Sequence, residues 1–166
     1  MEITHRSVVN LLHSMRREPG LVGSDVLLAV TTFSFDMAGL ELFLPLTSGA
    51  TLVVAPREAV LDAQLLQEEL ARSEATVMQA TPVTWRMLVT AGWRGDKRLK
   101  VMSGGEPFPR DLANQLSASC REVWNLYGPT ETTVYSTGCR LYPEPGLITI
   151  GRPIATTPVF ILRARQ

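Results

Sequence analysis

Apolar runs and amphipathic segments alternate along most of this chain. Short continuous apolar runs are typical of strands that are covered on both faces. Between them lie segments whose apolar residues recur three or four positions apart, which indicates helices. This pattern predicts strands over residues 25–30, 51–55, 76–80, 99–103 and 122–126, with helices over residues 37–44, 62–72, 82–91 and 109–118 between them.

Weaker signals lie on either side of this series. Val8 to Met15 have helical spacing, and Pro19-Gly20 is expected to end that helix. Residues 148–153 and 158–162 are short apolar segments that predict two further strands. Regular alternation with short connections favours an α/β fold with a mostly parallel, doubly wound sheet flanked by helices. We expect one domain, or part of one, over residues 1–166.

Residues at the predicted helix starts have two possible uses. Asp62 opens one predicted helix, and Thr81 is expected to cap another, with Pro82 in its first turn. Asp36 precedes the helix that we expect to end before Pro45. Its carboxylate could cap that helix or bind a ligand. Trp85 has the spacing of a core residue and is expected to pack rather than to react.

Polar residues collect where the predicted strands end. In a parallel sheet these ends share one edge, where such folds bind their ligands. A single polar group at a strand end could be an ordinary turn, whereas four such groups at one edge favour a binding cleft. The groups are Asp36, residues 79–81, residues 104–106 and residues 127–131.

Composition limits the classes of partner. The chain has 16 basic and 16 acidic residues, so its formal net charge of zero gives no electrostatic footprint for nucleic acid or an anionic membrane. No apolar run reaches the roughly 18 residues that span a bilayer. Cys120 and Cys139 are its two cysteines, which fits a reduced compartment better than a disulfide framework. We therefore expect a cytoplasmic protein with neither a nucleic-acid nor a membrane partner.

The residues alone leave the chemistry of the cleft open. The chain has two histidines and two isolated cysteines, which do not suit a His/Cys metal site, and it contains neither a G-x-S-x-G elbow nor a G-x-x-x-x-G-K-[ST] loop. Tyr127 could stack on a planar ring, while Thr130 and Glu131 could hold Mg²⁺ beside a phosphate. The pattern therefore predicts a cleft for a planar ligand, with or without phosphate.

One motif carries a resemblance to a known family. Residues 125–133, Asn-Leu-Tyr-Gly-Pro-Thr-Glu-Thr-Thr, closely resemble the N-x-Y-G-P-T-E motif of adenylation domains in nonribosomal peptide synthetases. These domains belong to the superfamily of adenylate-forming, AMP-binding enzymes. Other segments resemble family motifs at the expected positions, namely residues 4–11, 33–36, 40–43, 79–82 and 104–106.

The resemblance implies a fold and a reaction. The chain would be one flavodoxin-like subdomain of the N-terminal core of such an enzyme. Residues 1–166 would then be a partial adenylation domain, without the upstream phosphate loop and the C-terminal subdomain. The whole domain would convert an amino acid and ATP, with Mg²⁺, into aminoacyl-AMP and pyrophosphate. It would then pass the acyl group to the phosphopantetheine thiol of a carrier-protein domain, beside condensation domains. We expect the isolated chain to have little or no adenylation activity.

The resemblance also implies roles at the nucleotide site. Tyr127 would stack on adenine, and other motif residues would line the base. Thr130 would contact phosphate and Glu131 would hold Mg²⁺, so these two are the implied catalytic residues. The implied cofactor-binding residues are Gly104, Gly105, Glu106, Asn125, Tyr127, Gly128 and Thr130.

A second set of matched positions implies an amino-acid pocket. Phe35 matches an aromatic beside the route of the carboxylate, and Asp36 matches the carboxylate that pairs with the substrate α-ammonium. The remaining pocket positions are Met37, Leu40, Gln79, Met102, Gly104, Leu126, Val134 and Tyr135. The residues at these pocket positions, taken in order, resemble the glycine-selecting pattern of the family, although Met37, Met102, Val134 and Tyr135 depart from it. Glycine is therefore the expected substrate, and another small or polar amino acid is the alternative.

Two other functions compete with this one. An acyl-CoA or aryl-acid ligase of the same superfamily would have no ammonium for Asp36 to pair with. A non-catalytic flavodoxin-like binding module would use the same fold without the reaction.

Overall fold

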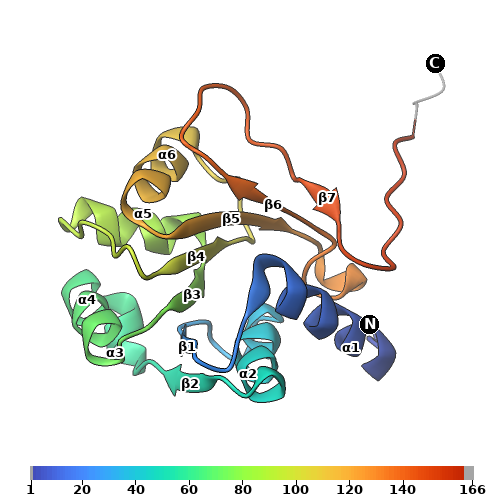
Figure 1. The fold of residues 1–166 in the computed structure, drawn as a ribbon, viewed down its shortest axis with the longest axis horizontal. Helices are drawn as coiled ribbons and strands as arrows, with labels where there is room; N and C mark the ends of the chain where they lie inside the picture. The colour runs from blue at the N-terminus through green and yellow to red at the C-terminus, as the bar shows by residue number, and fades with distance from the viewer. Residues whose placement is uncertain (1, 163–166) are drawn as a thin grey trace.

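The computed structural model describes residues 2–162 and places a seven-stranded sheet between two layers of helices (Figure 1). The strands are β1 (Val26–Ala29), β2 (Thr51–Val54), β3 (Val77–Ala80), β4 (Lys100–Ser103), β5 (Glu122–Tyr127), β6 (Thr137–Leu141) and β7 (Arg152–Pro153). The helices are α1 (His5–Met15), α2 (Met37–Ser48), α3 (Arg57–Leu61), α4 (Ala63–Arg72), α5 (Pro82–Thr90) and α6 (Arg110–Ser119). A π-helical turn, η1 (Arg16–Gly20), follows α1, and a 3-10 turn, η2 (Thr130–Thr132), follows β5.

The strand order of the sheet identifies its ligand-binding edge. The order is β2-β1-β3-β4-β5-β6-β7, in which β1 to β5 run parallel and β6 and β7 pair antiparallel. The chain moves outward from β1 to β2 and then returns to β3 on the other side of β1. Such a reversal opens a crevice at the C-terminal ends of the two strands that flank it. The predicted mostly parallel, doubly wound sheet is therefore confirmed.

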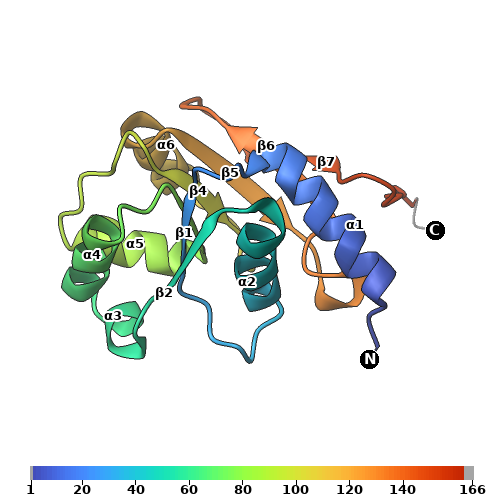
Figure 2. The same ribbon diagram turned by 60° about the horizontal axis from the view of Figure 1, so that its bottom comes forward.

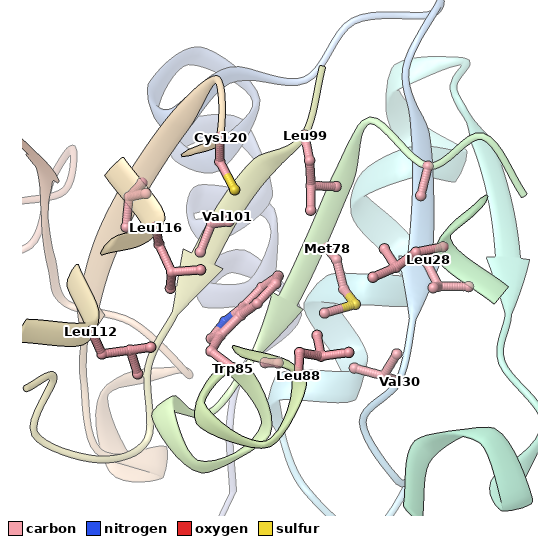
Figure 3. Packing of buried hydrophobic residues seen from close by; sticks show 14 of the residues in the cluster. Leu28, Val30, Met78, Trp85, Leu88, Leu99, Val101, Leu112, Leu116 and Cys120 are labelled. Atoms are coloured by element: carbon pink, nitrogen blue, oxygen red, sulfur yellow. The ribbon is translucent and has the colours of Figure 1, made fainter. Parts of the chain in front are cut away.

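Each face of the sheet has its own buried cluster. Neighbouring residues of a strand point to opposite faces, so Leu28 and Met78 pack with α4, α5 and α6, whereas Leu27 and Val77 pack with α1 and α2. Figure 2 shows α1 and α2 on one side of the strands and α4 and α5 on the other. Trp85 lies fully buried at the centre of the first cluster, as predicted, where its Nε1 donates to the carbonyl oxygen of Met102 at 3.3 Å (Figure 3).

Helix α2 extends further than its sequence predicts. Pro45 was expected to end it, but the helix continues to Ser48 and stops at Gly49, whose φ of 72° is left-handed. Leu40, Leu44 and Pro45 are all buried on this helix. Packing of this face therefore outweighs the backbone hydrogen bond that proline cannot make.

Other differences from the predicted elements concern short segments. Strand β6 and helix α3 were not predicted, because β6 contains Gly138 and the exposed Arg140 and shows neither an apolar run nor clean alternation. Of the two strands predicted near the C-terminus, only the two-residue β7 is present, and residues 158–162 form no strand. Pairing with a neighbour defines such segments, and a local pattern does not contain that information.

Two further observations bear on the expectations from composition. Cys120 and Cys139 are both free thiols. Within residues 2–162, no helix combines the length and the apolar character needed to cross a bilayer.

Of the three residues that precede these helices, Asp62 caps its helix through its side chain, whereas Asp36 and Thr81 do not. Asp62 Oδ1 accepts from the backbone N–H groups of Gln64 at 2.8 Å and Leu65 at 3.0 Å. Among the described residues, the side chains of Asp36 and Thr81 make no such capping bond. Asp36 is also helical in its own backbone, with φ of −62° and ψ of −28°. The capping interpretation of Asp36 is therefore wrong, and its carboxylate is available for another contact.

The caps differ enough to be separated by stability measurements. Asp62→Ala should lower the free energy of unfolding by about 1 kcal/mol, because two amide donors at the start of α4 lose their acceptor. Thr81→Ala should cost less, since its hydroxyl caps nothing at the start of α5. Urea denaturation of both variants checks this, and equal losses would contradict it.

Candidate functional site

The ends of the parallel strands meet at one edge of the sheet. A Cβ built on Gly105, just after β4, would lie 3.4 Å from the Sδ of Met37 and 3.7 Å from the Cγ2 of Thr81. The end of β4 therefore contacts both the start of α2 and the end of β3. Ser103 pairs with Asn125 in the neighbouring strand, which brings β5 to the same place. The predicted gathering of polar strand ends is present.

One cavity at this edge has the size of a ligand site. It has a volume of about 500 Å³, and its walls come from the ends of β4 and β5 and from residues 146–150. Small-molecule sites commonly measure roughly 300–1,000 Å³. Five of the predicted nucleotide residues line it, namely Gly105, Glu106, Asn125, Tyr127 and Gly128. Tyr127 is 50% exposed and lines this cavity, where its ring could stack on a planar ligand.

The wall formed by residues 146–150 was not predicted as part of the site. Leu147, Ile148 and Ile150 line the cavity from this segment. Arg110 Nε donates to the carbonyl oxygen of Gly146 and Arg110 Nη2 to that of Leu147, both at 2.9 Å. Asn125 Nδ2 donates to the carbonyl oxygen of Thr149 at 2.9 Å. A segment without a motif thus becomes a wall because side chains from α6 and β5 hold its backbone.

A second, smaller cavity lies on the other side of the same motif. Its volume is about 190 Å³, and Asp36, Leu40, Thr130 and Val134 of the predicted site line it. Another wall comes from α1, through Val8, Leu11 and Leu12, for which the sequence predicted a helix but no place in the pocket. Residues 125–133 therefore separate a larger cavity from a smaller one, with Gly128 on the first and Thr130 on the second.

The connection from β5 to β6 is tightly packed and strained. A Cβ on Gly128 would lie 2.6 Å from both the N of Ser136 and the Cα of Tyr135, so only glycine fits there. Thr133 and Val134 have left-handed φ angles of 71° and 63°. β-Branched residues rarely adopt such angles, and strain of this kind persists where the surroundings impose it, often at functional sites. Here it turns Val134 towards the smaller cavity.

Most predicted pocket residues are packed against one another. Gly104 is buried, and a Cβ there would lie 2.6 Å from both Cε1 and Oη of Tyr135, so the phenol ring covers this glycine. The pocket residues therefore leave little space between them. Those that share one buried cluster are Met37, Leu40, Met102, Leu126, Val134 and Tyr135.

Two buried polar atoms in this region lack partners. Gln79 Oε1 and Tyr135 Oη have no hydrogen-bond partner among the described residues. Gln79 uses its other end, because its Nε2 donates to the carbonyl oxygen of Met37 at 3.0 Å. Burial, with the charges of Glu41 and Asp36, raises the pKa of Tyr135 far above its usual value, so the phenol stays protonated. Unpaired buried polar atoms are costly and call for an explanation.

Three further predicted residues are exposed, and two of them, Phe35 and Glu131, line neither cavity. Phe35 is 63% exposed on the loop of residues 31–36, and Thr130 and Glu131 are exposed on η2. No group of three or more potential metal ligands occurs among residues 2–162. Mg²⁺ needs no such group, because it commonly takes one or two carboxylates together with phosphate and water. An exposed Glu131 beside Thr130 therefore fits a metal that a nucleotide brings with it.

A buried carboxylate to which the sequence assigned no role lies next to Gln79, a predicted pocket residue. Glu41 is 1% exposed on the inner face of α2. Its Oε2 accepts from the backbone N–H groups of Val30 at 3.0 Å and Thr31 at 2.9 Å. Burial raises the pKa of Glu41 to about 6, although its hydrogen bonds act in the opposite direction. Glu41 falls within residues 40–43, which resemble a family motif, but the sequence assigned it no role.

The family model for AMP-binding enzymes matches residues 1–166. The chain belongs to this family. The resemblance to adenylation domains of nonribosomal peptide synthetases is thereby confirmed, since the curated relatives of this AMP-binding chain are such synthetases.

Two of these relatives are similar to nearly the whole AMP-binding chain. It is 42% identical over 161 residues to a dimodular nonribosomal peptide synthase of Bacillus subtilis, covering 96% of the chain and 7% of the relative. It is also 42% identical over 168 residues to the PKS-NRPS hybrid synthetase acdB of Aspergillus candidus, covering 99% and 7%. The chain thus spans about one fourteenth of the length of each relative.

Solved structures agree with this family. A four-domain nonribosomal peptide synthetase bound to AMP and glycine superposes with a TM-score of 0.86 at 39% identity, over 92% of this chain and 12% of that one. The Vibrio cholerae adenylation domain AlmE in complex with glycyl-adenosine-5'-phosphate superposes with a TM-score of 0.83 at 25% identity, over 91% and 30%.

The contact between Gly104 and Tyr135 predicts a sensitive position in this AMP-binding chain. Gly104→Ala should lower the free energy of unfolding by roughly 1–3 kcal/mol, because the new methyl group would overlap Tyr135 and the backbone oxygen of Leu126. Gly39→Ala is the matched control, since a Cβ at Gly39 on α2 meets nothing within 4 Å. Urea denaturation of both variants checks this, and an unchanged Gly104→Ala midpoint would refute the close packing.

The raised pKa of Glu41 predicts how stability changes with pH. The Glu41 carboxyl has a pKa of about 6 in the folded protein, against 4.5 in the unfolded chain. The stability that this protonated carboxyl contributes is therefore fully present below pH 4.5 and is lost as the pH rises through 6. The loss is about 2 kcal/mol. It should appear as a difference between the unfolding free energies of the wild type and Glu41→Gln measured across this range, and a flat difference would contradict it.

Proposed function

We propose that this chain forms the nucleotide- and amino-acid-binding core of an adenylation domain that activates a small α-amino acid, glycine before others. The observation that carries the proposal is the pair of cavities on either side of residues 125–133. A reaction between two substrates needs both to be held next to each other, and this motif is the wall between the two.

The larger cavity suits a nucleotide. The exposed ring of Tyr127 would stack on adenine, while Gly105 and Asn125 form the walls beside it. Thr130 would contact phosphate from η2. Glu131 would hold Mg²⁺, which neutralises phosphate charge when bound.

The smaller cavity suits a small amino acid. Its volume of about 190 Å³ lies below the usual range for ligand sites, and its walls are mostly apolar. Asp36 is the carboxylate on that wall, and it can pair with an α-ammonium group. An acid without the ammonium would leave this carboxylate unpaired on binding, which discriminates against it. Two similar structures were solved with glycine or glycyl-AMP, which supports glycine for this chain.

The proposed reaction joins the two ligands across the motif. The substrate carboxylate oxygen attacks the α-phosphorus of ATP, so that an O–P bond forms while the bond to pyrophosphate breaks. Asp36 would hold the α-ammonium group of the substrate and so orient the substrate carboxylate. Thr130 would hold the phosphate beside it. The aminoacyl group would then pass to the phosphopantetheine thiol of a carrier-protein domain, next to condensation domains. A cytoplasmic location stays a prediction from composition.

Replacing Asp36 tests the pairing with the ammonium group. In the adenylation domain that contains this chain, Asp36→Ala should lower amino-acid-dependent ATP–pyrophosphate exchange roughly 10- to 100-fold, mainly through the KM for the amino acid. Asp111→Asn is the control, because Asp111 is an exposed partner of Arg86 and lines neither of the two cavities. An unchanged KM in Asp36→Ala would favour an acyl-CoA or aryl-acid ligase instead.

The size of the smaller cavity predicts an order of substrates. Exchange should be fastest with glycine, slower with alanine or serine, and slowest with phenylalanine or tryptophan, whose side chains exceed the space beside Leu40 and Val134. A panel of amino acids at equal concentration measures this order. Strong preference for a large aromatic amino acid would contradict the proposal, and no exchange with any amino acid would favour a binding module without catalysis.

A further inference from the structure

Glu41 is a buried carboxylate without a cationic partner among the described residues. Four donors surround its two oxygens instead. Oε2 accepts the backbone N–H groups of Val30 and Thr31, and Oε1 accepts the Thr31 hydroxyl at 2.6 Å and Gln79 Nε2 at 3.3 Å. A carboxylate offers two accepting oxygens, whereas a glutamine would place an NH₂ group against one pair of these donors.

These donors belong to the segment that leads from β1 to Asp36 and to strand β3, which contacts the start of α2. Val30 and Thr31 follow β1 and lead into the loop of residues 31–36, which ends with Asp36 at the start of α2. Gln79 comes from β3 and also donates to the carbonyl oxygen of Met37, the first residue of α2. One carboxylate on α2 therefore ties β1, β3 and the start of its own helix together.

Asp36 itself needs such support. Its side chain makes no capping bond to α2 among the described residues, and neighbouring Phe35 is largely exposed. The placement of the Asp36 carboxylate therefore depends on the backbone at the two ends of the loop. One end is helix α2, and the other is the pair of N–H groups that Glu41 holds.

We propose that Glu41 is a positioning residue of the adenylation site, which holds the loop of residues 31–36 and the amide of Gln79 so that Asp36 meets the ammonium group of the substrate. This inference rests on the proposed function of Asp36. Glu41 lies behind this loop and acts through it, so it is not a catalytic residue.

The energetics of the buried Glu41 carboxylate favour a role in positioning the loop over a role in stabilising the fold. Desolvation of the Glu41 carboxylate outweighs the favourable effect of its hydrogen bonds, as its raised pKa shows. Keeping an ionised carboxylate there at neutral pH therefore lowers stability. A residue that costs stability and aligns a site is the kind of trade-off expected near function.

The first experiment measures exchange kinetics in the adenylation domain that contains this chain. Glu41→Gln should raise the KM for the amino acid about tenfold while the KM for ATP stays within about twofold, because misplacing Asp36 affects one substrate. Thr31→Val removes one of the four donors and should raise the same KM by a smaller factor. In the double variant the two effects should not multiply, since both act through one contact.

Controls and a second readout separate positioning from general damage. Thr47→Val makes the same chemical change on α2, where the Thr47 hydroxyl donates to the carbonyl oxygen of Phe43 on the exposed face, and should leave both KM values unchanged. Amide hydrogen exchange of Val30 and Thr31 in the same domain should speed up in Glu41→Gln and stay constant in Thr47→Val.

Each outcome decides the matter. A raised amino-acid KM with faster exchange at Val30 and Thr31 supports the proposal. An unchanged amino-acid KM, or a fall in kcat with both KM values unchanged, would overturn it. If the unaltered domain activates no amino acid, the proposed function fails, whereas unchanged amide exchange in Glu41→Gln would refute the hold on the loop independently of activity.

Discussion

Parallel pairing of β1, β3, β4 and β5 is the constraint on which the rest of this structure depends. In that arrangement the C-terminal ends of all four strands lie at one edge, and each strand must be covered on both faces. The register pairs Gln79 with Met102 and Ser103 with Asn125, which places the amino-acid residues beside the nucleotide residues. A shift of one residue in any strand would turn these side chains to the other face.

Close approach of backbone at two glycines completes the site. Gly128 allows the backbone of residues 134–136, just before β6, to lie directly against the motif, and Gly104 accepts the ring of Tyr135. The strained pair Thr133 and Val134 lies between these two contacts. Close packing and strain together pull the pocket residues into one buried cluster, which explains why the cavity beside Asp36 is small.

Buried polar groups mark where this fold gives up stability for function. Glu41 is ionised inside the protein at neutral pH, and Gln79 and Tyr135 each keep a buried polar atom without a partner among the described residues. The three lie close to one another, since Gln79 Nε2 donates to Glu41 and the charge of Glu41 raises the pKa of Tyr135. An apolar core would be more stable, but it could not orient a charged substrate.

The sequence by itself determined the α/β class, the order of the main elements and the motif residues, because continuous apolar runs and helical spacing are local patterns. It also marked Asp36, Tyr127 and Glu131 as candidates through one specific motif. Only the tertiary structure decided that α2 passes Pro45, that β6 exists and that residues 146–150 form a wall. It also decided the role of Glu41, whose donors lie 10, 11 and 38 residues away in the sequence. Packing and pairing between distant residues set these features, and no local pattern contains them.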